Sequence, residues 1–276
     1  MTAAMAVCKR EFKAYFLTSI GYVIVSIVAV LCGLSFSLQF LEYAQISQDP
    51  TTYGYATVPD FEEYLLSPFL VFCGVLLMFL SPLITMRLLA EEKNRGTMEL
   101  LLTQPLRDRD IIFGKYAAAL AMVGVMLLII SIDLAVVAYF TNVEPAVLVL
   151  GLLTVFLMGA AFISLGLFVS AITANQITSG AITFGLSLVL FILGNVGQDL
   201  PAENPAPAGW PEALRNGIGA VYNVFRGFLQ EMAVDAHARE MAQGILQPQD
   251  ILYYILFSAF FLFLTFRALE SRNWRS

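Results

Sequence analysis

Six apolar runs separated by polar segments dominate the chain. A helix needs about 20 apolar residues to cross the hydrocarbon core of a membrane, and the runs reach or approach this length. They cover residues 20–40, 65–89, 116–140, 147–171, 177–193 and 251–266. The pattern therefore predicts an all-α integral membrane protein with six transmembrane helices. In the second run, Pro82 is expected to kink the helix close to its end.

The N-terminal residues 1–18 have a different pattern, in which apolar and basic positions alternate. Phe12, Tyr15 and Phe16 recur at helical spacing beside the cations of Lys9 and Lys13. Such a segment is typical of an interfacial helix that lies on the membrane surface. An ordinary basic flank that anchors the first span fits the same residues.

Residues 195–250, between the fifth and sixth runs, form the longest polar stretch. It begins with four prolines and then has apolar residues three and four positions apart, which predicts an amphipathic helix. These residues are Ile218, Val221, Tyr222, Phe225, Phe228, Leu229 and Met232. The helix would serve as a re-entrant or interfacial gate over a translocation path, or would simply rest on the bilayer.

The distribution of basic residues predicts the orientation of the spans. If the six helices alternate in direction, twelve of the fifteen Lys and Arg residues lie on one side, and only Arg215, Arg226 and Arg239 lie on the other. Cytoplasmic segments carry this excess, so both termini and residues 91–109 are expected in the cytoplasm and 195–250 outside it. A 59% hydrophobic chain with a mean hydropathy of +0.77 fits a multi-pass membrane protein.

Residues 91–106 combine strong charge with exposed leucines. A glycine allows a change of direction, a threonine caps a following helix, an acid complements its positive end and a proline stops it. The predicted helix is only about 12 Å long, so its leucines need a partner surface, either the lipid headgroups or a soluble protein. The residues with these roles are Glu91, Glu92, Gly96, Thr97, Glu99, Leu100, Leu101, Leu102 and Pro105.

The order Glu-Glu-Lys-x-x-Gly-Thr-x-Glu-x-Leu-Leu-x-x-Pro in this segment resembles the coupling helix of ABC-2 type (type-2 ABC exporter) permeases. The resemblance implies a permease subunit that exports a substrate or transmits ATPase motion, with these nine residues in contact with the ATPase. It also implies two copies of a soluble ABC ATPase, a second permease copy or a sister permease, an extracytoplasmic accessory subunit and surrounding membrane lipid. The tail 267–274 and residues 226–228 resemble the gliding-motility branch of these permeases.

Chemistry of other kinds has little support in the sequence. The chain lacks a G-x-x-x-x-G-K-[ST] loop, and His237 is its single histidine, which leaves no pattern for a P-loop ATPase or a histidine-rich zinc enzyme. We therefore expect no catalytic residues, cofactor, metal or nucleic acid. A membrane scaffold that does not transport is the main alternative.

Asp133 is the one carboxylate well inside a predicted span. An acid at this depth is costly and suggests a polar site that faces water or a helix partner. A structural role, in which Asp133 packs against a hydroxyl such as that of Ser131, explains it equally. A secondary transporter, the less favoured alternative, would need ionisable residues near the membrane midplane, and only Asp133 comes near.

Overall fold

The computed structural model describes residues 3–96, 107–140, 144–207 and 209–270, which form helices joined by turns and loops, without a strand among them. Within these ranges, six long helices are apolar enough to cross a membrane. These six are Ser19–Gln48, Glu62–Asn94, Asp108–Val136, Pro145–Ile172, Gln176–Asp199 and Pro248–Glu270. The predicted all-helical fold with six spanning helices is confirmed, and the chain is a multi-pass membrane protein.

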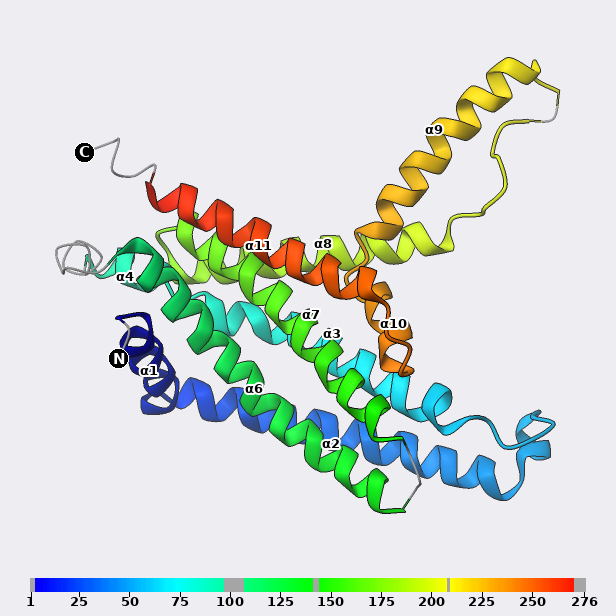
Figure 1. The fold of residues 1–276 in the computed structure, drawn as a ribbon, viewed down its shortest axis with the longest axis horizontal. Coiled ribbons are helices and arrows are strands. Elements are labelled where there is room, and N and C mark those ends of the chain that lie inside the picture. Colours follow the sequence, from blue (N-terminus) through cyan, green and yellow to red (C-terminus); the bar gives the residue numbers. More distant parts are fainter. Residues whose placement is uncertain (1–2, 97–106, 141–143, 208, 271–276) are drawn as a thin grey trace.

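Figure 1 shows the long helices running side by side. They are α2 (Ser19–Gln48), α3 (Ser67–Thr85), α6 (Asp108–Phe140), α7 (Pro145–Ile172), α8 (Gln176–Asp199) and α11 (Pro248–Glu270). The shorter elements are α1 (Ala3–Leu17), a 3₁₀ turn (Pro50–Tyr53), a π-helical turn (Glu62–Leu66), α4 (Ala90–Asn94), α9 (Glu212–Glu231) and α10 (Ala236–Ala242).

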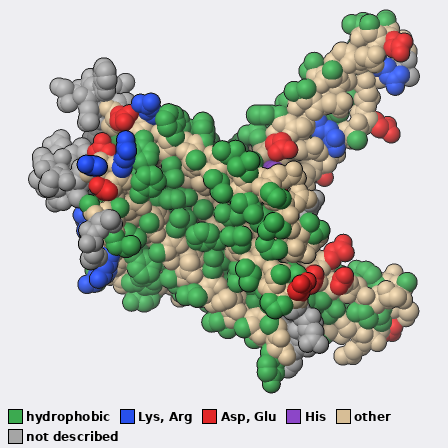
Figure 2. Space-filling model, viewed as in Figure 1, with side chains coloured by type: hydrophobic (Ala, Val, Ile, Leu, Met, Phe, Trp, Pro, Cys, Tyr) green, Lys and Arg blue, Asp and Glu red, His purple; other side chains and the backbone are tan. Residues whose placement is uncertain are grey.

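The two ends of the bundle differ in charge. Helices α1 and α4 and the start of α6 lie together at one end, where blue Lys and Arg side chains gather in Figure 2. We call this the basic end. The connection between α2 and α3 lies at the opposite end, together with α9 and α10. Hydrophobic side chains cover the face of the bundle between the two ends (Figure 2).

Glycines allow the central helices to approach closely. A Cβ atom added at Gly166 of α7 would lie 2.2 Å from Thr85 Oγ1 of α3, and one at Gly151 would lie 2.3 Å from Leu70 Cδ1. Only glycine therefore fits at position 166, whereas a side chain at position 151 would require Leu70 to move, and α7 packs directly on α3. Close approach of this kind holds helices together in lipid, where apolar surface alone gives little net attraction.

Several helices extend beyond the apolar runs that predicted them. The first spanning helix continues to Gln48 instead of ending near residue 40, and the fifth continues to Asp199. Backbone hydrogen bonding does not stop where hydrophobicity does, because a polar segment can prolong a helix into water. In the second span, α3 ends at Thr85, soon after Pro82, and the chain turns before α4 begins at Ala90.

Candidate functional site

A buried lysine joins three helices at the basic end. The side chain of Lys115, in the second turn of α6, is only 1% exposed. Its Nζ atom lies 3.1 Å from Oε1 of Glu11 on α1 and 2.9 Å from Oε1 of Glu92 on α4. A buried ammonium is tolerated only with such partners, because it has lost its water. Lys115, Glu11 and Glu92 form what we call the Lys115 triad.

The triad forms because α1 can lie directly on α6. A Cβ atom added at Gly114 would lie 2.7 Å from Val7 Cβ and 2.8 Å from the Ala4 carbonyl oxygen. Any larger residue would separate the two helices. The glycine next to Lys115 thus brings Glu11, one turn further along α1, within reach of the ammonium.

Tyr15 fastens α1 to the end of α3. Its hydroxyl donates a hydrogen bond of 2.9 Å to the Ile84 carbonyl oxygen, and both groups are buried. Carbonyls in the last turn of a helix have no partner within the helix, so Tyr15 supplies one. Burial, followed by the negative charge of Glu11, raises the pKa of Tyr15, which keeps the phenol protonated as a donor.

Glu11 is held in its ionised form. Burial by itself would raise the pKa of this carboxyl, but the charges and hydrogen bonds of Lys115 and Arg10 outweigh burial and hold it below its usual range. Arg10 Nη2 lies 2.7 Å from Glu11 and 3.3 Å from Glu92, so it adds a second, more exposed cation to the triad.

Helix α4 is also fixed to the end of α7. The hydroxyl oxygen of Ser170 accepts hydrogen bonds from the backbone N–H groups of Leu89 (3.1 Å) and Ala90 (3.0 Å). These N–H groups stand at the start of α4, where a helix leaves donors unpaired, so Ser170 caps α4 from another helix. The Lys93 ammonium donates to the Ala171 carbonyl oxygen near the C-terminal end of α7.

Charged side chains continue along α4 on its other side. Glu91 lies 3.5 Å from Arg87 Nε and 2.7 Å from Arg95 Nη2. A hollow of about 260 Å³ separates this group from α1, with Tyr15 on its far wall. Gly96 follows with a φ of +67°, a left-handed conformation that favours glycine and turns the chain after α4.

Of the nine residues predicted to contact an ATPase, the structure describes three. Glu91 and Glu92 lie on α4 and Gly96 directly follows it. Glu92 belongs to the Lys115 triad, which the sequence did not predict. The other six lie outside the described residues: Thr97, Glu99, Leu100, Leu101, Leu102 and Pro105.

Sequence reasoning also missed Glu11, Lys115 and Ser170. One signal was available for Glu11, which is the single acid among Lys9, Arg10 and Lys13. A negative charge weakens the attraction of such a helix for anionic lipid headgroups. Its presence therefore suggests that Glu11 binds a specific cation in the protein. Lys115 served only as a topology marker in the sequence, and nothing there distinguishes it from an exposed cation.

Asp133 lies on α6, away from the Lys115 triad. Its Oδ2 atom is buried without a hydrogen-bond partner among the described residues. Ser131, the hydroxyl suggested by the sequence, donates instead to the Leu128 carbonyl oxygen at 2.8 Å. The structure thus leaves the proposed site at Asp133 without a partner among the described residues for this oxygen.

A second polar cluster lies at the opposite end, where α9, α10 and α11 meet. His237 Nδ1 is 2.8 Å from Asp250 Oδ1, and its Nε2 is 3.7 Å from Glu231 Oε2. The imidazole stacks on the Tyr253 ring with 4.0 Å between centroids. Within the part of the chain that the structure describes, no group of three or more His, Cys, Asp or Glu residues is placed to hold a metal ion.

Comparison with protein families shows to which family the chain belongs. A family model described as ABC-2 family transporter protein matches residues 5–266. The chain belongs to the ABC-2 transporter family. It is therefore a permease component of an ABC transporter, and membership implies a partnering ABC ATPase because these permeases lack an ATPase domain. A search of curated proteins found no match.

Polar contacts at the basic end connect five helices of this permease. The Lys115 triad, Tyr15 and Ser170 connect α4 to α1, α6, α3 and α7. Five elements from α1 to α7 therefore share one polar network at the point where the predicted coupling segment begins.

Proposed function

We propose that this ABC-2 permease exports a substrate, or transmits ATPase motion across the bacterial inner membrane, when two copies of a soluble ATPase act on its basic end. The basic end faces the cytoplasm in this proposal, with both termini there. The permease works as a pair with a second copy or a sister permease. We also place the permease in the gliding-motility branch of the family, because its tail resembles the tail of that branch.

The observation that carries this proposal is the family match over residues 5–266. Two features support it. The basic residues collect at the end that holds α4, as cytoplasmic ends do. The chain also lacks the glycine-rich loop that cradles nucleotide phosphates, so the ATP chemistry is expected on another subunit.

The mechanism follows from how α4 is held. A partner that pushes on residues 97–106 pushes on α4, which directly precedes them. Glu92 passes this displacement to Lys115 on α6 and through it to Glu11 on α1, while Ser170 passes it to α7. These contacts are short and mostly buried. The attached helices therefore move together as one rigid body.

The leucines of the coupling segment give a direct test. In this proposal they sit in a groove of the ATPase, so Leu101→Asp places an unpaired charge in a closed interface. Glu99→Lys places a cation at the positive end of a helix. We expect the ATPase to co-purify with the wild-type permease, to be largely lost with Leu101→Asp and to be reduced with Glu99→Lys.

Leu246→Asp is the matched control, because Leu246 is an exposed leucine at the opposite end of the bundle. This variant should keep its ATPase, and all variants should be inserted in the membrane at equal levels. If Leu101→Asp and Glu99→Lys both retain the full amount of ATPase with normal stimulated hydrolysis, the segment does not couple the two proteins and its leucines rest on the bilayer.

A further inference from the structure

The hollow of about 260 Å³ at the basic end lies between α1 on one side and α4 with the chain before it on the other. We call it the α1–α4 hollow. It is large enough for a compact ion and much too small for a whole phospholipid. Its polar lining consists of Glu11, Tyr15, Thr18, Arg87, Glu91 and Arg95.

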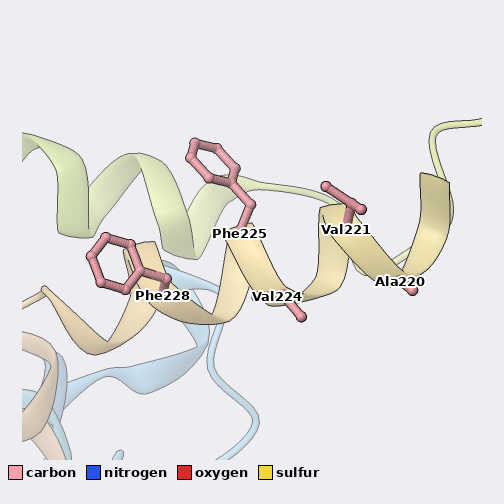
Figure 3. A pocket seen from close by; sticks show the side chains of 5 residues that line it. All are labelled: Ala220, Val221, Val224, Phe225 and Phe228. Carbon is pink, nitrogen blue, oxygen red and sulfur yellow. The ribbon is translucent and has the colours of Figure 1, made fainter. Parts of the chain in front are cut away.

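Arginines distinguish the α1–α4 hollow from two others in the described part of the chain. The hollow of about 490 Å³ along α9 is lined by two valines, two phenylalanines and an alanine (Figure 3). The hollow of about 270 Å³ beside His237 contains the carboxylates of Glu231 and Asp250, and its lining includes no Lys or Arg. Of these three, the α1–α4 hollow alone offers cations to an anionic ligand.

The arginines of this hollow are only partly neutralised. The two carboxylates of the Lys115 triad are already balanced by its ammonium and by Arg10. Arg87 and Arg95 instead share one carboxylate, that of Glu91, at 3.5 Å and 2.7 Å. Among the described residues that line the hollow, this sharing leaves one positive charge in excess. A ligand with one negative charge would balance it.

Arg87 also retains donors that its neighbours do not use. Its Nη1 atom donates a hydrogen bond of 3.2 Å to Thr18 Oγ1. Its Nε atom is buried and makes no hydrogen bond within the described ranges, so the contact with Glu91 is a loose ion pair. A guanidinium carries five N–H donors in a planar fork that matches the oxygens of a phosphate group. Arg87 is therefore suited to bind such a group in the hollow.

The N-terminal end of α2 adds positive potential at the same place. Thr18 stands at the N-cap position of α2, but its side chain makes no capping hydrogen bond. The hydroxyl points back to α1, where it lies 3.1 Å from the Ala14 carbonyl oxygen and 3.2 Å from that of Tyr15. The start of a helix has unpaired N–H groups and a partial positive charge that attract anions. The first span thus begins beside Arg87 with an end that favours a phosphate.

Exposed apolar side chains at the rim indicate that the anion belongs to a lipid. Leu17, directly before Thr18, is 75% exposed. Tyr22 lies one turn along α2 from Thr18, on the same face, and is 60% exposed. Because α2 is a spanning helix, its exposed side chains are open toward lipid, and tyrosine is typical of the headgroup level. A ligand can keep its charged part at Arg87 while its chains follow α2.

We propose that the α1–α4 hollow binds the phosphate group of a membrane phospholipid, with Arg87 and Arg95 as its ligands and the start of α2 beside it. The acyl chains run along α2 past Tyr22. The bound lipid links the start of the first span to α4 and so extends the polar network of the basic end. This inference goes beyond the proposed function and does not depend on it, since it requires only a chain in a membrane.

Lipid binding to the purified protein tests the proposal. The full permease is isolated together with its ATPase and freed of lipid in detergent. Native mass spectrometry then measures the binding of phosphatidylglycerol, of diacylglycerol with the same acyl chains, and of inorganic phosphate. Diacylglycerol lacks the phosphate, and inorganic phosphate lacks the chains. We expect phosphatidylglycerol to bind at least about tenfold more tightly than either.

Substitutions of opposite sign locate the site. Arg87→Gln or Arg95→Gln leaves Glu91 to neutralise the remaining arginine, so each should weaken phosphatidylglycerol binding about tenfold. Glu91→Gln leaves both arginines without their shared acid and should tighten binding. Arg267→Gln is the control and should change nothing. Arg267 is an exposed arginine that pairs with Glu270 in the last turn of α11, at the same end of the bundle.

Misfolding would weaken binding in every variant, so tighter binding by Glu91→Gln separates the proposal from a loss of structure. Equal binding of diacylglycerol and phosphatidylglycerol would overturn the phosphate site. Equally tight binding of inorganic phosphate would show a site for free anions instead of lipid. Equal losses in Arg95→Gln and Arg267→Gln would show general attraction to the basic end. Loss of the ATPase from Arg87→Gln and Arg95→Gln, with lipid binding unchanged, would mean that the hollow takes an acidic group of the ATPase.

Discussion

Glu11 and Glu92, from helices at opposite ends of the first hundred residues, bind the same ammonium group. Lys115 lies 3.1 Å from the first carboxylate and 2.9 Å from the second, and is itself almost fully buried. Two acids that share one cation are held together by it and would repel each other without it. The position of α1 relative to α4 therefore depends on a residue that belongs to neither helix.

Lys115→Met should destabilise the permease strongly. The substitution keeps roughly the length of the side chain but leaves the carboxylates of Glu11 and Glu92 facing each other without its charge, beside the more exposed Arg10. Loss of one partner from a buried ion pair costs about 3–5 kcal/mol. We expect the midpoint of thermal unfolding in detergent to fall by several degrees and ATPase stimulation by the permease to fall with it.

Arg267→Met provides the control for this prediction. Arg267 pairs with Glu270, but both side chains are more than half exposed. Exposed pairs contribute about 0–1 kcal/mol, so this variant should unfold within a degree or two of the wild type. Equal effects of the two substitutions would show that the Lys115 triad has no special role.

Acid should weaken the contact between α1 and α6. The pKa of Glu11 is lower in the folded protein than the ordinary value of about 4.3. The ionised Glu11 side chain thus stabilises the folded state fully at pH values above the ordinary pKa. This stabilisation is lost as the pH falls through the lower pKa of the folded state. Glu11→Gln should unfold at a lower temperature than wild type at pH 7, and this difference should shrink as the pH falls below about 4.3. A constant difference over that range would contradict the assignment.

Gly166→Ala and Gly185→Ala form a matched pair in two spanning helices. The first adds a Cβ atom 2.2 Å from Thr85 Oγ1, whereas the second adds one with nothing within 4 Å. Overpacking typically costs about 1–3 kcal/mol. Gly166→Ala should lower the midpoint of thermal unfolding, and Gly185→Ala should leave it unchanged or raise it slightly. Similar losses in both variants would contradict the contact between Gly166 and Thr85 as the cause of the effect.

Single cysteines at Thr52 and Asn94 test the orientation. Both residues are exposed, and they lie at opposite ends of the bundle. In intact cells, and in a background without native cysteines, an impermeant maleimide should label Thr52→Cys and should label Asn94→Cys only after the membrane is opened. Labelling of Asn94→Cys from outside would reverse the proposed topology.

The spanning helices could be predicted because a membrane requires long apolar runs, and this requirement is visible one segment at a time. The contacts of Lys115 could not be predicted in this way, because they depend on how residues such as Gly114 bring α1, α4 and α6 together. For α9, the periodicity predicted a helix correctly. It did not show that Leu229 would be buried while Val224 remained open, because period alone does not reveal which neighbour covers a face.

The place of α1 in the network has a consequence for biosynthesis. Glu11 and Lys115 are 104 positions apart, and the Ile84 carbonyl that holds Tyr15 also comes much later than α1. The amphipathic N-terminal helix therefore leaves the ribosome long before its binding surface exists. Its main binding surface, on α6, does not exist until the third span is inserted, so the lipid surface is the available resting place for its outer side during synthesis. Docking of α1 then marks the moment at which the first half of the permease is assembled.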